Sequence, residues 1–284
     1  MKQELFILPF DHRTSFFRDI PGLKEKDQKK QEQALKEFKS IIFDAFLLSI
    51  KSEKDRKSFG ILVDEEYGEE VLEKAKKEKI TVCLPVETSG KEELSLEYGK
   101  DFEKHVDKFK PDFVKVLIRY NPKNKETNKR QREVLKKINS LSKRYKIILE
   151  LLVPPAEGED KKKYDKEVRD DRTVEAIKEI SKAIKVDVWK LEGFGKIQWN
   201  KVIASVPKKS NIIFLGRGRS KKDVAEWLKS AASHEEIIGF AVGRTVFLDA
   251  VKKYSQKKIS RKKAVETISL NFKKLVNLWR KERK

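Results

Sequence analysis

The sequence predicts a closed (β/α)8 barrel, the TIM-barrel fold, formed by residues 1–284 as one domain with an extra C-terminal helix. Eight short apolar runs rich in β-branched residues recur along the 284 residues. Charged segments with helical periodicity separate these runs, and no Pro/Gly/Ser-rich linker divides the chain. Buried parallel strands form near-continuous apolar runs of this kind, and helices cover such a sheet on its outer face.

The expected strands are the eight apolar runs, at residues 5–11, 59–66, 80–87, 112–120, 146–153, 186–193, 211–218 and 237–244. The expected helices lie at about 24–51, 68–78, 99–109, 124–144, 171–184, 196–206 and 220–232, with one after the eighth strand and a last one at 261–281. An open doubly wound sheet is the alternative. Its Gly-rich fingerprint would follow the first strand, where this chain has DHRTSF (11–16).

The charge balance is strongly basic, with 67 Lys+Arg against 46 Asp+Glu and a net charge of +21. Such a charge attracts anionic small molecules. Most lysines alternate with glutamates in the helical segments, which is typical of solvated helix faces with i,i+4 pairs. This pattern favours ordinary helix surfaces over a nucleic-acid interface, so we expect no nucleic-acid partner.

The single cysteine, Cys83, excludes an internal disulfide and fits a reducing compartment. No apolar run reaches the roughly 18 residues of a membrane span. The first residues enter a strand-like run without a signal-peptide pattern. We therefore expect a soluble, cytoplasmic protein without a membrane partner.

Polar residues recur at the carboxyl ends of the predicted strands, where the active site of such a barrel lies. Two long loops, at 88–98 and 154–170, also follow strands, and the second is long enough to form a lid over a site. The residues that we expect to contact a substrate are Asp11, His12, Arg13, Asp64, Glu87, Arg119 and Glu192.

Side-chain alternation places two lysines and a carboxylate on faces that carry apolar core residues. The segment VDVWKLEGF (186–194) shows this most clearly, because its lysine is in line with valines. If these faces line the barrel, the three polar groups point into one cavity. The pairs that share a face are Val188 with Lys190, Phe113 with Lys115, and Ile148 with Glu150.

Two lysines and a carboxylate in one cavity are suited to imine chemistry. A partly desolvated lysine close to another cation, here Lys190 beside Lys115, loses its proton more easily. Its neutral amine can attack a ketone, and a carboxylate such as Glu150 can carry the protons. The competing interpretation is a structural ion pair of Lys190 with Glu150 or Glu192.

The last two strands end in GRGRS (216–220) and VGRT (242–245), which indicate a phosphate site. Glycines expose backbone N–H groups, the following helix N-terminus adds positive charge, and arginines clamp phosphate. Loops after the seventh and eighth strands are the usual phosphate site of this barrel. The residues assigned to it are Gly216, Arg217, Gly218, Gly243 and Arg244.

We expect no cofactor and no metal ligand. The three histidines, at positions 12, 105 and 234, are far apart in the sequence, so a His-rich zinc site is not expected. Mg²⁺ held by Asp64, Glu66 or Glu87 stays open at this point.

The order of the motifs resembles the tagatose-bisphosphate aldolase family of class I aldolases, over residues 5–280. The similar stretches are FDHR (10–13), VDEEYG (63–68), VETSG (86–90), VKVLIRYN (114–121), LELL (149–152), DVWKLE (187–192) and GFAVGRTVF (239–247). The sequence is more similar still to the aldolase-like module that follows a sugar kinase in bacterial inositol-catabolism proteins. That module is associated with 2-deoxy-5-keto-gluconate 6-phosphate aldolase, which yields dihydroxyacetone phosphate and malonate semialdehyde.

The resemblance implies a Schiff-base lysine at Lys190, with Glu150 and Lys115 as its proton-handling partners. It implies a class I aldolase for a phosphorylated keto sugar or keto sugar acid, so a phosphorylated sugar is the expected partner. Two alternatives remain, a Mg²⁺-dependent lyase on the same barrel and a basic binding protein that has lost turnover. The sequence leaves a homo-oligomer open.

Overall fold

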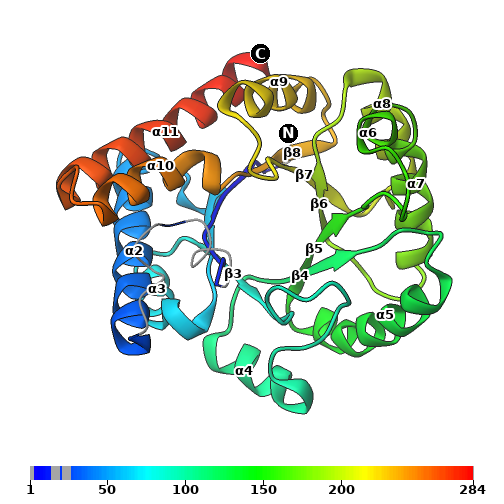
Figure 1. Ribbon diagram of the computed structural model, residues 1–284, viewed down its shortest axis with the longest axis horizontal. Coiled ribbons are helices and arrows are strands. Elements are labelled where there is room, and N and C mark those ends of the chain that lie inside the picture. The colour runs from blue at the N-terminus through cyan, green and yellow to red at the C-terminus, as the bar shows by residue number, and fades with distance from the viewer. Residues whose placement is uncertain (1–2, 14–19, 21–26, 284) are drawn as a thin grey trace.

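Eight parallel strands form a closed barrel in the computed structural model, which describes residues 3–13, 20 and 27–283 (Figure 1). Each strand pairs with the next along the chain, and the eighth pairs with the first. The predicted fold class is therefore confirmed. The strands are β1 (Leu5–Pro9), β2 (Phe59–Leu62), β3 (Thr81–Pro85), β4 (Phe113–Arg119), β5 (Lys146–Leu152), β6 (Val188–Glu192), β7 (Asn211–Leu215) and β8 (Ile237–Ala241).

Helices surround the barrel, as Figure 1 shows in the view along its axis. The last of them is the predicted extra helix, which packs against α2, α9 and α10. Among the described residues, no helix is both long and apolar enough to cross a membrane. The helices are α2 (Gln28–Ser49), α3 (Glu65–Lys77), α4 (Phe102–Phe109), α5 (Lys125–Ile138), α6 (Lys161–Glu167), α7 (Arg169–Ile180), α8 (Lys196–Ser205), α9 (Lys221–Ala232), α10 (Arg244–Ser255) and α11 (Arg261–Glu282), with short 3₁₀ turns at η1 (Arg56–Ser58), η2 (Gly99–Asp101) and η3 (Asn139–Lys143).

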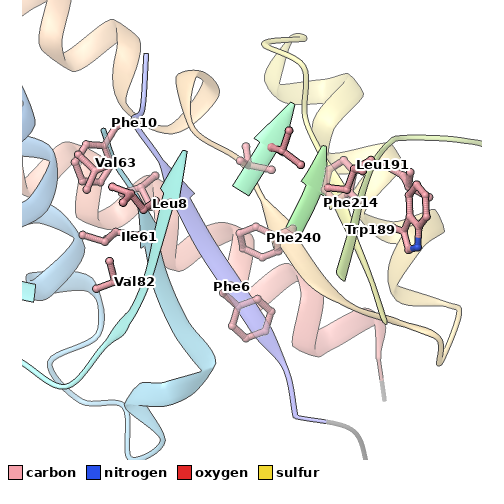
Figure 2. Packing of buried hydrophobic residues seen from close by; sticks show 14 of the residues in the cluster. Phe6, Leu8, Phe10, Ile61, Val63, Val82, Trp189, Leu191, Phe214 and Phe240 are labelled. Atoms are coloured by element: carbon pink, nitrogen blue, oxygen red, sulfur yellow. The ribbon is translucent and has the colours of Figure 1, made fainter. Parts of the chain in front are cut away.

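Strand alternation divides the buried apolar residues into two clusters. The larger lies between strands and helices and includes Trp189 and Leu191, which Figure 2 shows near Phe214. The smaller contains Ile148 and Val188, with Phe113 packed against it. Since alternate side chains point to opposite faces of a strand, Lys190, Glu150 and Lys115 share the inner face with these three residues. The predicted parity is correct.

The second strand is shorter than predicted. It ends at Leu62, and Asp64 caps helix α3 by accepting a hydrogen bond from the backbone N–H of Tyr67 at 3.0 Å. An N-cap carboxylate satisfies one of the unpaired N–H groups of the first turn, which is why the helix begins at Glu65 rather than at 68.

The loop predicted at 154–170 contains helix α6. Asp160 caps this helix by accepting from the backbone N–H of Lys163 at 2.7 Å. The Tyr164 hydroxyl donates to the carbonyl of Val153 at 2.7 Å, which holds α6 against the end of β5. This segment therefore has secondary structure of its own, and none of it lines the cavity described next.

Candidate active site

A cavity of about 520 Å³ opens at the carboxyl ends of the strands. Of the fifteen residues predicted for the site, thirteen line it, and Asp64 and Glu192 do not. The convergence follows from the parallel sheet, since all eight strands end at this rim. The thirteen are Asp11, His12, Arg13, Glu87, Lys115, Arg119, Glu150, Lys190, Gly216, Arg217, Gly218, Gly243 and Arg244.

Lys115 lies at the centre of a group of three carboxylates. Its Nζ is 2.9 Å from Asp11 Oδ2, 2.6 Å from Glu87 Oε1 and 3.2 Å from Glu150 Oε2. The lysine is buried, with 2% of its surface exposed. An ammonium group has three protons to donate, and here three carboxylates from β5 and from the ends of β1 and β3 surround it.

Lys190 has a different environment. Its Nζ donates to Glu150 Oε2 at 2.7 Å, the same oxygen that lies near Lys115. The register of the sheet sets this contact, because Glu150 and Lys190 are direct neighbours on β5 and β6. Glu150 therefore bridges the two lysines.

These contacts differ from one expectation drawn from the sequence. We expected Lys115 to act on Lys190 as a nearby cation. In the structure, three carboxylates offset the Lys115 charge, and the pair of lysines shares one of them. The cluster consists of two ammonium groups and three carboxyl groups, all of them largely buried.

The carboxyl groups of the cluster differ in pKa. Burial raises the pKa of Glu87 above its usual value, and the nearby Lys115 offsets this only in part. For Glu150, burial acts in the same direction, but the ammonium groups of Lys190 and Lys115 outweigh it and lower the pKa. Glu87 thus binds a proton more readily than Glu150 does.

Two further members of the cluster, Asp11 and Lys115, carry stable charges. Burial opposes the charged forms, yet Lys115 holds the pKa of Asp11 well below its usual range. The three carboxylates, led by Asp11, likewise keep the pKa of Lys115 well above the value of a free lysine despite burial. Lys115 is therefore a permanent cation at neutral pH.

His12 is neutral at neutral pH. Burial lowers its pKa to about 4, assisted by the positive charge of Arg244, although Asp11 opposes the shift. A neutral imidazole has one donor and one acceptor nitrogen, as an amide side chain has one donor and one acceptor group. Neutral His12 can therefore both donate and accept a hydrogen bond at the rim of the cavity.

The loop after β7 meets the start of α10. Arg217 and Gly218 both have left-handed backbones, with φ of 47° and 67°. A side chain at Gly218 would clash with Arg244, whose guanidinium carbon lies 2.8 Å from the position that a Cβ would take. Glycine suits this position because of its positive φ and because Arg244 packs against it, so the loop backbone and Arg244 form one corner of the cavity.

Arg119 and Arg13 position the loop that follows β3. Arg119 donates to the carbonyl of Lys91 at 3.0 Å, and Arg13 donates to the carbonyl of Glu87 at 3.0 Å. Residues 88–94 line the cavity, so the shorter of the two predicted long loops forms its wall. The sequence of this loop does not indicate that it folds over the cavity. The antiparallel bridge between Glu87 and Leu96 reverses the chain and places the loop there.

Two predicted residues have other partners. Asp64 is buried and forms a close ion pair with Lys39 of α2, besides capping α3. Glu192 is buried and forms a close ion pair with Arg217. Among the described residues, no group of three or more His, Cys, Asp or Glu side chains is arranged to hold a metal ion.

The fold and site define a (β/α)8 barrel with a buried lysine–carboxylate cluster at its carboxyl end. Residues 1–283 match the model of a family described as an uncharacterized protein conserved in bacteria (DUF2090), and the chain belongs to that family. No curated protein matches the chain.

Solved structures that share the fold include the following three. The protein Cgl0159 from Corynebacterium glutamicum is 16% identical with a TM-score of 0.61, covering 95% of this chain and 85% of its own. An archaeal fructose 1,6-bisphosphate aldolase is 14% identical with a TM-score of 0.55, and the match covers 90% of this chain and 92% of the aldolase. A Schiff-base-forming fructose-1,6-bisphosphate aldolase is 12% identical with a TM-score of 0.56, and the match covers 90% of this chain and 93% of that aldolase. At these identities the likeness concerns the fold.

Proposed function

We propose that the chain is a class I aldolase that cleaves a phosphorylated keto sugar or keto sugar acid through a Schiff base on Lys190. The observation that carries the proposal is the cluster of two lysines and three carboxylates at the carboxyl end of the barrel. Imine formation needs an amine and groups that move protons, and this cluster contains both. Two of the similar structures are of fructose-bisphosphate aldolases, one named as Schiff-base-forming, which supports this chemistry.

The contacts favour Lys190 over Lys115 as the nucleophile. A lysine must lose its proton before it can attack a carbonyl carbon. Lys115 is held as a cation by three carboxylates, which raise its pKa. Lys190 donates to Glu150 alone among the described residues, so transfer of one proton along the 2.7 Å hydrogen bond would free its lone pair.

The proposed reaction uses the remaining groups in turn. The Lys190 amine adds to the substrate ketone, and Glu150 moves the protons needed to lose water and form the protonated imine. The substrate hydroxyl then gives its proton to the Glu87 carboxylate, the C–C bond breaks to release an aldehyde, and the electrons of that bond enter the imine to give an enamine. Glu87, whose pKa is raised, can then protonate the enamine carbon. Water hydrolyses the resulting imine, which releases the second product and regenerates the Lys190 amine. Lys115 keeps the carboxylates in place and stabilises negative charge.

The corner formed by Arg244 and the Gly216–Gly218 loop would hold the substrate phosphate. The N-terminus of α10 lies at this corner, and helix N-termini favour anions. Arg244 lines the cavity and packs against Gly218, so it is the arginine that we assign to direct phosphate contact.

The motif resemblance supports 2-deoxy-5-keto-gluconate 6-phosphate as substrate, with tagatose 1,6-bisphosphate as the alternative. A panel of phosphorylated keto sugars and keto sugar acids, assayed for release of a triose phosphate, tests the proposal. We expect cleavage of at least one, abolished by Lys190→Met and retained after exhaustive chelation. Turnover that requires added Mg²⁺ or Zn²⁺ would move the assignment to a metal-dependent lyase.

A further inference from the structure

A second cavity, of about 930 Å³, opens at the opposite end of the barrel, where the strands begin. Its floor contains apolar residues of the inner face, among them Leu5, Val188 and Ile238. Its volume lies within the range of small-molecule sites. The proposed aldolase reaction, at the carboxyl ends, makes no use of it.

Six lysines from separate segments line this cavity: Lys57, Lys76, Lys79, Lys110, Lys146 and Lys209. All six are exposed, and none forms an ion pair with another described residue. Unpaired lysines occur elsewhere on this basic chain, but here they surround one hollow. Two of them, Lys79 and Lys110, have left-handed backbones with φ of 56° and 43°, where glycine or asparagine is the usual choice.

The carboxylates of the cavity do not balance these charges. Its lining contains three, which offset only half of the positive charge of the six lysines, and each has other hydrogen-bond partners. Asp112 accepts from the backbone N–H of Val82 at 2.8 Å, and Asp187 accepts from that of Ile147 at 2.8 Å. Glu4 accepts from the indole of Trp279 at 3.2 Å and lies 3.5 Å from Arg280. Six lysines against three carboxylates leave the lining with a formal excess of three positive charges, so an anion in the hollow would be attracted.

We propose that this end of the barrel binds a small polyanion with several linked phosphate groups, a polyphosphate or a nucleoside polyphosphate. Lysines are point charges on flexible stems, which suit several phosphates at once, whereas paired arginines would indicate a single carboxylate or phosphate. The half-buried ring of Phe113, with Lys146 5.7 Å above its centroid, offers an apolar surface that a nucleobase can contact.

The first test is calorimetric titration with inorganic tripolyphosphate, ATP and orthophosphate at fixed ionic strength. We expect one tripolyphosphate or ATP per chain, bound much more tightly than orthophosphate and more weakly as salt rises. The triple variant Lys79→Gln, Lys146→Gln, Lys209→Gln should lose about 10- to 100-fold in affinity. A matched control, Lys253→Gln, Lys262→Gln, Lys274→Gln, removes three charges from α10 and α11 and should bind within about twofold of the parent.

The candidate active site also attracts phosphate, so Arg244→Ala is included: it should weaken binding at that site only and leave the affinity of the tight, lysine-lined site unchanged. Labelling of the unmodified protein with an amine-acetylating reagent adds a readout that needs no variant: tripolyphosphate should protect the six lysines and leave Lys253 and Lys262 reactive. Loss of binding in Arg244→Ala, or equal losses in the two triple variants, would overturn the proposal. Duplex DNA that binds through the same lysines and is not displaced by tripolyphosphate would also overturn it, in favour of a nucleic-acid surface.

Discussion

Lys115 and Lys190, the two lysines of the buried lysine–carboxylate cluster, should contribute very differently to the free energy of unfolding. Lys115→Met removes the cation from the middle of Asp11, Glu87 and Glu150, leaving Asp11 and Glu87 without the ammonium group that they contact. Breaking a buried ion pair by removing one partner costs about 3–5 kcal/mol. Lys190→Met removes one hydrogen bond, while Glu150 keeps Lys115 at 3.2 Å and the methionine keeps the volume, so we expect a cost of about 1–2 kcal/mol.

The cost of Lys115→Met should depend on pH. Without the cation, the pKa values of the buried carboxyl groups rise above those of the unfolded chain, so the folded variant binds more protons than the unfolded one. The penalty is then full at neutral pH and shrinks as the pH falls towards 5. Urea unfolding followed by circular dichroism at pH 7.5 and 5 measures both effects.

Lys104→Met serves as the control for these two variants. Lys104 pairs with Asp101 at 2.7 Å on an exposed helix face, and such a pair contributes little, so its loss should change stability by less than about 0.5 kcal/mol. Equal free energies of unfolding for Lys115→Met and Lys190→Met, or a Lys115→Met penalty that does not change with pH, would contradict the charge arrangement on which the proposed roles rest.

Three further predictions concern the cavity. Glu150→Gln should slow turnover about 10²- to 10⁴-fold while leaving some imine formation, measured as residual borohydride trapping. Arg244→Ala should weaken use of a phosphorylated substrate about 10- to 100-fold in kcat/KM, whereas Arg219→Ala, which contacts Asp165 outside the cavity, should have little effect. Because the pKa of His12 is lowered to about 4, the unfolded chain binds a proton there first as the pH falls from 6.5. Between pH 6.5 and 4 the parent should therefore lose about 1–2 kcal/mol more stability than His12→Gln. This estimate is reduced for solvent screening, because a quarter of the His12 side chain is exposed. Parallel plots of unfolding free energy against pH for the two proteins, measured by urea unfolding, would contradict this.

The sequence could predict which side chains of the site point into the barrel, because side chains alternate along each strand. A period of two decides which face a residue occupies, so the inward orientation of Lys115, Glu150 and Lys190 follows from their spacing to Phe113, Ile148 and Val188. The register between β5 and β6 then sets the contact of Glu150 with Lys190.

The partners of Lys115 could not be predicted in the same way. Asp11 is 104 positions and Glu87 is 28 positions away in the sequence, and their approach depends on how the barrel closes. The same limit explains Asp64. A carboxylate between a strand and a helix is both a candidate site residue and a candidate N-cap, and Lys39 on α2 is the distant partner that holds it away from the cavity.

Borohydride trapping with a cleaved substrate, followed by peptide mapping, tests the central claim most directly. We predict one covalent adduct per chain, on Lys190, absent from Lys190→Met, which should stay folded and inactive. An adduct on Lys115, with Lys190→Met still active, would contradict the account, and so would cleavage that leaves no trapped adduct on any lysine.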